Sequence, residues 1–123
     1  MKKLFFYLII INSFLYANSA EILLKQNKCM SCHNIMGIKS APSFSMILKM
    51  NSGWFGISRN SIKNSIKNGS QGKYPMFSDV KMPAYKHLSN QDLNTLARWI
   101  VHNGSKGMHN CMRFKKHQMK GMR

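Results

Sequence analysis

Residues 29–33 read Cys29-Met30-Ser31-Cys32-His33, and the rest of the chain is interpreted from this stretch. Cys-x-x-Cys-His is the attachment signature of a c-type haem. Two thiols three positions apart can each form a thioether bond to one edge of a porphyrin, and the adjacent imidazole then lies under the ring as the proximal iron ligand. The sequence therefore predicts one haem c, covalently bound through Cys29 and Cys32, with His33 on the iron.

Two other interpretations of the paired cysteines lack support elsewhere in the chain. A structural zinc site needs two further clustered ligands, but the only other cysteine is Cys111, far along the sequence. A thioredoxin-like redox pair needs a strand–helix–strand context, and no strand-like alternation surrounds residues 29–33. Haem attachment is the interpretation that remains.

The composition indicates one small, strongly basic domain. The chain has 123 residues, with 19 Lys and Arg against 3 Asp and Glu, a formal net charge of +16. Such an excess favours contact with an acidic protein or an anionic membrane surface. We expect a monomer that does not bind nucleic acid. A covalent haem also suits a short chain, because an apolar cofactor supplies core that a small domain lacks.

The N-terminus has the layout of a secretory signal peptide. Lys2 and Lys3 precede an apolar run over residues 4–15, and small residues follow from Ala17 to Ala20. The run is shorter than the ~20 residues that a membrane-spanning helix needs. The sequence thus predicts a signal peptide over residues 1–20 and a periplasmic protein; an uncleaved N-terminal anchor is the alternative.

Residues 21–104 are predicted to form an all-α haem domain without a sheet. The expected helices cover residues 21–30, 43–50, 58–68 and 89–102. In the last of them, an apolar stripe comprises Leu93, Leu96, Ala97, Ile100 and Val101. This stripe is expected to pack across the first helix and close the domain.

Cap residues mark the ends of two of these helices. Asn68-Gly69 is expected to close the third helix, and Asn103-Gly104 the last. Ser89 opens the last helix, with Asp92 three residues later, which is close to a capping box.

The loop over residues 70–87 has no helical or strand period, so packing and iron ligation are expected to hold it. Met82 precedes Pro83 there, and a thioether opposite a histidine raises the potential of the iron, which suits electron transfer. We therefore predict Met82 as the second axial ligand. Met76 and His87 are the alternatives in the same loop.

Five segments, in this order and spacing, resemble the small bacterial class I monohaem cytochromes c. They are Cys29–His33, Pro42, Ile66–Gly72, Met82-Pro83 and Leu88–Ile100. The resemblance covers roughly residues 21–103. It implies a class I cytochrome c fold, with about four short helices wrapped around one haem.

The resemblance also implies roles for single residues. The carbonyl of Pro42 would accept a hydrogen bond from the second ring nitrogen of His33 and so fix its tautomer. Tyr74 would lie near the haem propionates, and Trp99 would pack by the haem. His33 and Met82 would be the proximal and distal ligands.

Residues 105–123 form a tail with six Lys or Arg and no acidic residue. Such a segment is expected to be disordered, because it buries too little apolar surface to offset the entropy of ordering. An electrostatic docking arm is one alternative. Another is Cu(I) binding by the soft ligands Met108, His109, Cys111, Met112, His117 and Met119.

These features predict an exported one-electron carrier, not an enzyme, whose iron cycles between Fe(II) and Fe(III). Its expected partners are acidic proteins of a respiratory chain: a quinol-oxidising complex upstream, and a terminal oxidase, peroxidase or nitrite reductase downstream. Lysines flanking the haem segments are expected to steer that contact, namely Lys28, Lys39, Lys73, Lys81 and Lys86. A haem sensor or peroxidase-like domain with a labile sixth ligand is the alternative function.

Overall fold

The computed structural model describes residues 19–53 and 56–120, without the side chains of residues 53, 56, 57, 111 and 114–120. The predicted signal segment up to residue 18 and the side chain of Cys111 lie outside this description. Residues 19–26 are helical, and they precede α2 (Cys29–Cys32), α3 (Phe44–Asn51), α4 (Arg59–Asn68) and α5 (Asn90–Lys120). The prediction of an all-α fold is confirmed.

Besides the helices, the described residues form a minimal antiparallel ribbon, which the sequence did not predict. Strands β1 (Ser52–Gly53) and β2 (Gly56–Ile57) pair Ser52 with Ile57 and Gly53 with Gly56. The ribbon joins α3 to α4. Among the described residues, no helix combines the length and apolar character needed to cross a bilayer.

The predicted single helix over residues 21–30 is wrong in two respects. The helix includes residues 19 and 20, and Ala20 is only 2% exposed, so the packed domain begins before Glu21. The helix then breaks at Lys28, whose φ of 53° is left-handed and cannot continue an α-helix. The Tyr85 hydroxyl stabilises the chain at this break by donating a hydrogen bond to the carbonyl oxygen of Asn27 (3.1 Å).

Helices α3 and α4 follow their sequence signals. The Oγ of Ser43 caps α3 by accepting from the backbone N–H of Met46 (3.2 Å). Ser58 caps α4 in the same way, accepting from Ser61 (3.3 Å). Gly69 ends α4 with a φ of 76°, as predicted from Asn68-Gly69.

Helix α5 begins as predicted and ends far beyond the predicted residue. The backbone N–H of Asp92 donates to Ser89 Oγ (3.1 Å), and that of Ser89 donates to Asp92 Oδ2 (3.1 Å), so the capping box is present. The helix then runs through Asn103-Gly104 and on to Lys120. The prediction that it stops at Gly104 before a disordered tail is wrong.

The reason lies in how α5 crosses α3. Gly104 and Gly107 are buried within the helix. A Cβ on Gly104 would lie 2.7 Å from Leu48 Cδ1 and 2.9 Å from the carbonyl oxygen of Phe44. Both glycines therefore let two helices approach closely, rather than giving the backbone a left-handed turn.

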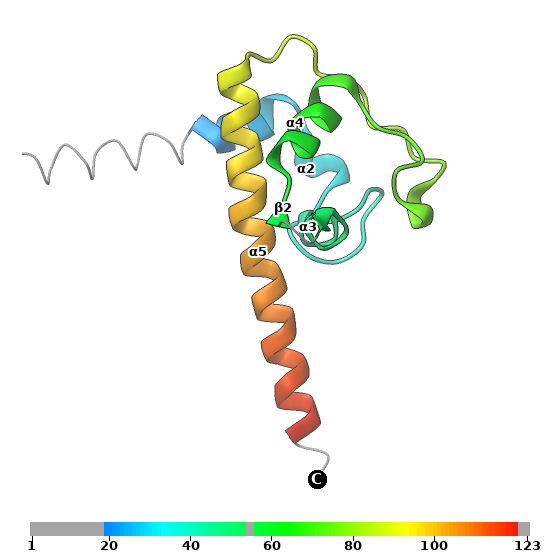
Figure 1. Ribbon diagram of the computed structural model, residues 1–123, viewed down its shortest axis with the longest axis vertical. Coiled ribbons are helices and arrows are strands. Elements are labelled where there is room, and N and C mark those ends of the chain that lie inside the picture. Colours follow the sequence, from blue (N-terminus) through cyan, green and yellow to red (C-terminus); the bar gives the residue numbers. More distant parts are fainter. Residues whose placement is uncertain (1–18, 54–55, 121–123) are drawn as a thin grey trace, which may run out of the picture.

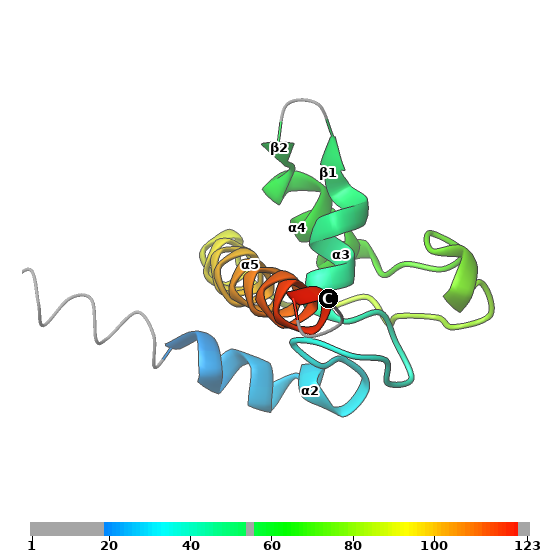
Figure 2. The same ribbon diagram turned by 90° about the horizontal axis from the view of Figure 1, so that it is seen from below.

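A single core forms where α5 packs against α3 and α4 (Figure 1). The segment 19–26 lies on the other side of α5 from these two helices (Figure 2). The buried cluster comprises Leu24, Phe44, Leu48, Ile62, Ile66, Leu88, Leu93, Leu96, Ala97 and Ile100. The predicted apolar stripe of the last helix is thus core, with Val101 at its edge.

Candidate functional site

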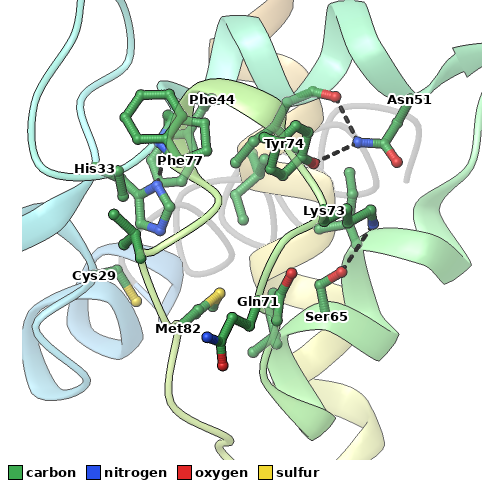
Figure 3. A pocket seen from close by; sticks show the side chains of 18 of the residues that line it. Cys29, His33, Phe44, Asn51, Ser65, Gln71, Lys73, Tyr74, Phe77 and Met82 are labelled. Atoms are coloured by element: carbon green, nitrogen blue, oxygen red, sulfur yellow. Dashed lines mark hydrogen bonds between the residues drawn. The ribbon is translucent and has the colours of Figure 1, made fainter.

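A largely apolar cavity opens between α3, α4 and α5 on one side and the loop over residues 70–82 on the other (Figure 3). The space between these walls, counted out to its open mouth, is about 840 Å³. Its apolar wall includes Phe44, Ile47, Ile62, Ile66, Leu96 and Ile100. Cys29, His33 and Met82 bring their sulfur and nitrogen atoms to the same cavity.

His33 is buried, with 8% of its surface exposed, and stacks on Phe44 at 5.3 Å between ring centroids. Its Nδ1–H donates to the carbonyl oxygen of Pro42 at 2.7 Å, which is the hydrogen bond expected from the sequence. Burial lowers the pKa of His33, against the opposing effect of the Pro42 hydrogen bond. In a neutral imidazole whose Nδ1 carries the proton, Nε2 has a free lone pair, and this atom faces the cavity as a possible metal ligand.

The two cysteines stand at the first and last positions of α2, one helical turn apart. This spacing places both on one side of the helix. Cys29 is half-buried and lines the cavity, whereas Cys32 is exposed and is not among the residues that line it. Burial raises the pKa of the Cys29 thiol, and the neighbouring Cys32 adds to the rise.

Met82 reaches the cavity from the opposite wall, and its sulfur faces His33 (Figure 3). Its backbone pairs with Ser70, with N–H···O distances of 2.8 Å from Met82 and 3.2 Å from Ser70. Gly69 makes this approach possible, because a Cβ there would lie 2.7 Å from the carbonyl oxygen of Met82. The structure thus fixes the Met82 backbone through two hydrogen bonds to the end of α4.

The alternative ligands lie elsewhere. Met76 follows Pro75 in a short 3₁₀ turn (Pro75–Phe77) and is 69% exposed. His87 is exposed, and its Nε2 lies 3.1 Å from Asn27 Oδ1. Neither residue lines the cavity.

Polar side chains gather at one end of the cavity, around Tyr74 (Figure 3). Asn51 donates to the Tyr74 hydroxyl (2.8 Å) and accepts from Ser61 (3.1 Å). Lys73 donates to the hydroxyls of Ser61 and Ser65 at 2.9 and 3.0 Å. Burial raises the pKa of Tyr74, partly offset by the Asn51 hydrogen bond, and burial lowers the pKa of Lys73.

The sequence predicted Tyr74 at this end but missed Asn51 and Ser65. Asn51 terminates α3, so its sequence context indicates only a helix end. Ser65 follows Ile62 by three residues, so it shares the face of α4 that lines the cavity, where it accepts a hydrogen bond from Lys73. No local pattern distinguishes either residue.

Trp99, which the resemblance places by the haem, is not among the residues that line the cavity. It meets Phe44 edge-on, with centroids 5.7 Å apart, and Phe44 lies between it and the cavity. The reason is helical geometry: Leu96 and Ile100, one turn apart, face the cavity, and Trp99 is rotated from that line toward α3.

A paired thiol motif, a neutral imidazole and a thioether around an apolar cavity form a donor set that fits a covalently attached haem. Comparison with known proteins agrees. A model of the cytochrome c family matches residues 17–104. The chain therefore belongs to the cytochrome c family, as a small class I monohaem member, and it binds haem c covalently through Cys29 and Cys32.

The comparisons also find a similar curated protein and similar solved structures. Cytochrome c-551 of Pseudomonas aeruginosa is 29% identical over 86 residues, which cover 70% of this chain and 78% of that protein. Cytochrome c552 of Nitrosomonas europaea, a crystal structure, is 25% identical with a TM-score of 0.57, over 68% of this chain and 98% of its own. The class 1 cytochrome MtoD of Sideroxydans lithotrophicus shares the fold, at 17% identity and a TM-score of 0.55 over 72% and 96% of the two chains.

Family membership makes the protein a haem-based electron-transfer protein.

Proposed function

We propose that this chain is an exported one-electron carrier whose iron is held by His33 and Met82 and which serves a respiratory chain. When bound, the haem supplies an iron that accepts and releases one electron. The observation that carries the proposal is the placement of His33 and Met82 on opposite walls of one cavity, facing each other (Figure 3).

The chain's own residues prepare both ligand positions. Pro42 holds the imidazole through its Nδ1–H, so that Nε2 remains the coordinating atom. The paired backbone of Ser70 and Met82 holds the thioether from the other side. With His33 and Met82 in both positions, the site would exclude a substrate from the iron, which suits a carrier.

The surrounding side chains control the environment of the cofactor. The aliphatic wall excludes water and keeps the local dielectric low. Asn51, Lys73 and Tyr74 supply donors at one end, where they would receive the propionate carboxylates. A cation and two neutral donors suit such anionic groups.

Export and partner choice complete the proposal. Lys2, Lys3 and the apolar run after them support a signal peptide and a periplasmic location. Lys28, Lys39, Lys81 and Lys86 are exposed beside the segments that form the cavity, and would steer an acidic partner to the haem edge. Association with a quinol-oxidising complex or a terminal reductase should then slow as ionic strength rises, and a rate independent of salt would contradict steering.

The absorption spectrum of the holo-protein tests the ligand assignment. The oxidised protein should show the far-red band of sulfur-to-iron coordination, and Met82→Ala should abolish it. The reduced Met82→Ala protein should bind carbon monoxide at once, because the sixth position is then open.

Met76→Ala and His87→Ala are the matched controls, since they remove the alternative ligands from the same loop. Both should keep the far-red band. If Met76→Ala lost the far-red band and Met82→Ala kept it, Met76 and not Met82 would be the sixth ligand. An unsubstituted protein that is high-spin and binds carbon monoxide directly would instead indicate a sensor or a peroxidase-like protein.

A further inference from the structure

A second hollow lies between the start of α4 and the middle of α5, and basic side chains dominate it. Arg59 comes from the first turn of α4, and Arg98, His102, Lys106 and His109 come from α5. All five side chains are exposed. We call this set the basic groove.

The basic groove faces away from the haem cavity. Leu96 and Ile100 of α5 line the cavity, whereas Arg98 and His102 line the groove. Two residues along an α-helix correspond to a rotation of about 200°, so the two sets lie on opposite faces of α5. A partner in the groove would therefore leave the haem side of the molecule open.

The basic and imidazole side chains of α5 form a continuous stripe along the helix. Their spacing of four, four and three residues from Arg98 to His109 keeps them on one face. Arg113, also exposed, follows four residues later, where α5 extends beyond the rest of the molecule (Figure 1). In the sequence the same spacing continues at Lys116 and Lys120, whose side chains lie outside the described part.

No carboxylate lines this groove. The chain has three acidic residues, Glu21, Asp79 and Asp92, and none of them is among the groove residues. Asp92 is held by the capping box at the start of α5, where Ser89 Oγ donates to it at 2.7 Å. The described residues that line the groove therefore include basic side chains and no acidic one.

We infer that the basic groove docks an acidic segment of a protein partner, at a site separate from the haem edge. A concave surface with cations on two walls suits a protruding helix or extended segment that carries Asp and Glu. It suits a flat bilayer less well, because lipid headgroups in a plane do not enter a hollow.

The apolar side of α5 also argues against insertion of this helix into a membrane. An interfacial helix buries its apolar face among lipids. Here Gly104 and Gly107 pack that face against α3 and the segment containing Met36, while the basic stripe points outward. The outward stripe is thus arranged for a charged partner. Such docking would hold the carrier on one protein while its other face exchanges electrons.

Titration of the mature holo-protein with a synthetic peptide of about ten glutamates tests the inference, monitored by calorimetry and by amide shifts of the ¹⁵N-labelled protein. Shifts should concentrate at Arg59, His102, Lys106 and His109. The double variant Arg59→Glu/Lys106→Glu should lower the affinity about tenfold or more. Glutamate at position 59 favours the start of α4 electrostatically, so the fold should persist.

Lys25→Glu/Lys49→Glu is the matched control, because both residues are exposed outside the groove and the net charge changes equally. It should bind the peptide within about twofold of the unsubstituted protein. Equal losses in the two variants, or shifts concentrated at the haem edge, would overturn the inference.

Vesicles of equal parts phosphatidylglycerol and phosphatidylcholine form the second arm. The inference would be wrong if neither the unsubstituted protein nor Arg59→Glu/Lys106→Glu bound the peptide, while the unsubstituted protein bound vesicles and the double variant did not. The occupant of the groove would then be a membrane. The haem spectrum and reduction by ascorbate should be the same in all variants, so a failure of the proposed ligand assignment would be visible separately.

Discussion

The dipeptide Asn-Gly occurs at Asn68-Gly69 and at Asn103-Gly104, and the two copies have opposite outcomes. The first ends α4, where Gly69 has φ 76° and ψ 176°, a region populated almost only by glycine. The second lies within α5, where Gly104 stays helical and buried. Identical local sequence thus gives a helix end in one place and a continuous helix in the other.

Each glycine lies in close contact with a residue that is distant in sequence, where a larger side chain would not fit. Gly69 lies against the carbonyl oxygen of Met82, at 2.7 Å from a virtual Cβ. Gly104 lies against Leu48 of α3 at the same distance. One glycine brings the Met82 loop to the cavity, and the other lets α5 cross α3. A glycine after a helical stretch therefore indicates either a turn or a close contact between segments.

Among the glycine substitutions, Gly69→Ala should lower the free energy of unfolding the most. The added methyl group meets backbone atoms that cannot move alone, and the backbone conformation itself disfavours alanine. We expect a loss of about 3 kcal/mol or more in the free energy of unfolding, measured with urea on the holo-protein, and a weaker far-red band as Met82 is displaced.

Gly72→Ala is the control for Gly69→Ala. Gly72 also has a positive φ, 67°, but a Cβ there would meet nothing within 4 Å. Gly72→Ala should lower the free energy of unfolding by only about 1 kcal/mol, because of backbone strain, and the far-red band should remain. Equal losses for the two variants would mean that contact with Met82 contributes nothing.

Gly104→Ala should have an intermediate effect. Alanine favours the helix by about 1 kcal/mol, but overpacking against Leu48 and the Phe44 carbonyl costs about 1–3 kcal/mol, so a net loss of up to about 2 kcal/mol is expected. The far-red band should persist, because Met82 is not involved. In a double-mutant cycle with Leu48→Val, part of the loss should be recovered. A gain in stability would show that α3 and α5 are not in close contact.

Gly107→Ala should have the smallest effect. A Cβ there would lie 2.5 Å from Ser45 Oγ and 2.7 Å from Met36 Cγ, which belong to side chains that can rotate. The cost of disturbing the hydrogen bond from Ser45 to Ile35 opposes the gain in helix propensity, so the unfolding free energy should change by less than about 1 kcal/mol. A loss as large as that of Gly69→Ala would contradict this ranking.

The haem site divides in the same way between local and distant information. Cys29, Cys32 and His33 are adjacent in sequence, so their chemistry could be predicted from spacing alone. Pro42 follows within nine residues of His33, and its hydrogen bond was expected. Asn51 and Ser65 were not predicted, because the cavity that they line forms only where α3 and α4 meet the loop that carries Lys73 and Tyr74. The rotation of α5 decides which of its residues reach the cavity: Leu96 and Ile100 line it, whereas Trp99 does not.

By itself, the sequence determined the covalent haem, the all-α class, the capping box at the start of α5 and the end of α4, since each depends on residues a few positions apart. Tertiary structure alone decided that the first helix breaks at Lys28 and that α5 continues to Lys120, and it brought Met82, rather than Met76 or His87, into the cavity with His33. The physical reason is that these features depend on contacts between residues distant in sequence. At Gly104, packing against α3 outweighs the local tendency of Asn-Gly to end a helix.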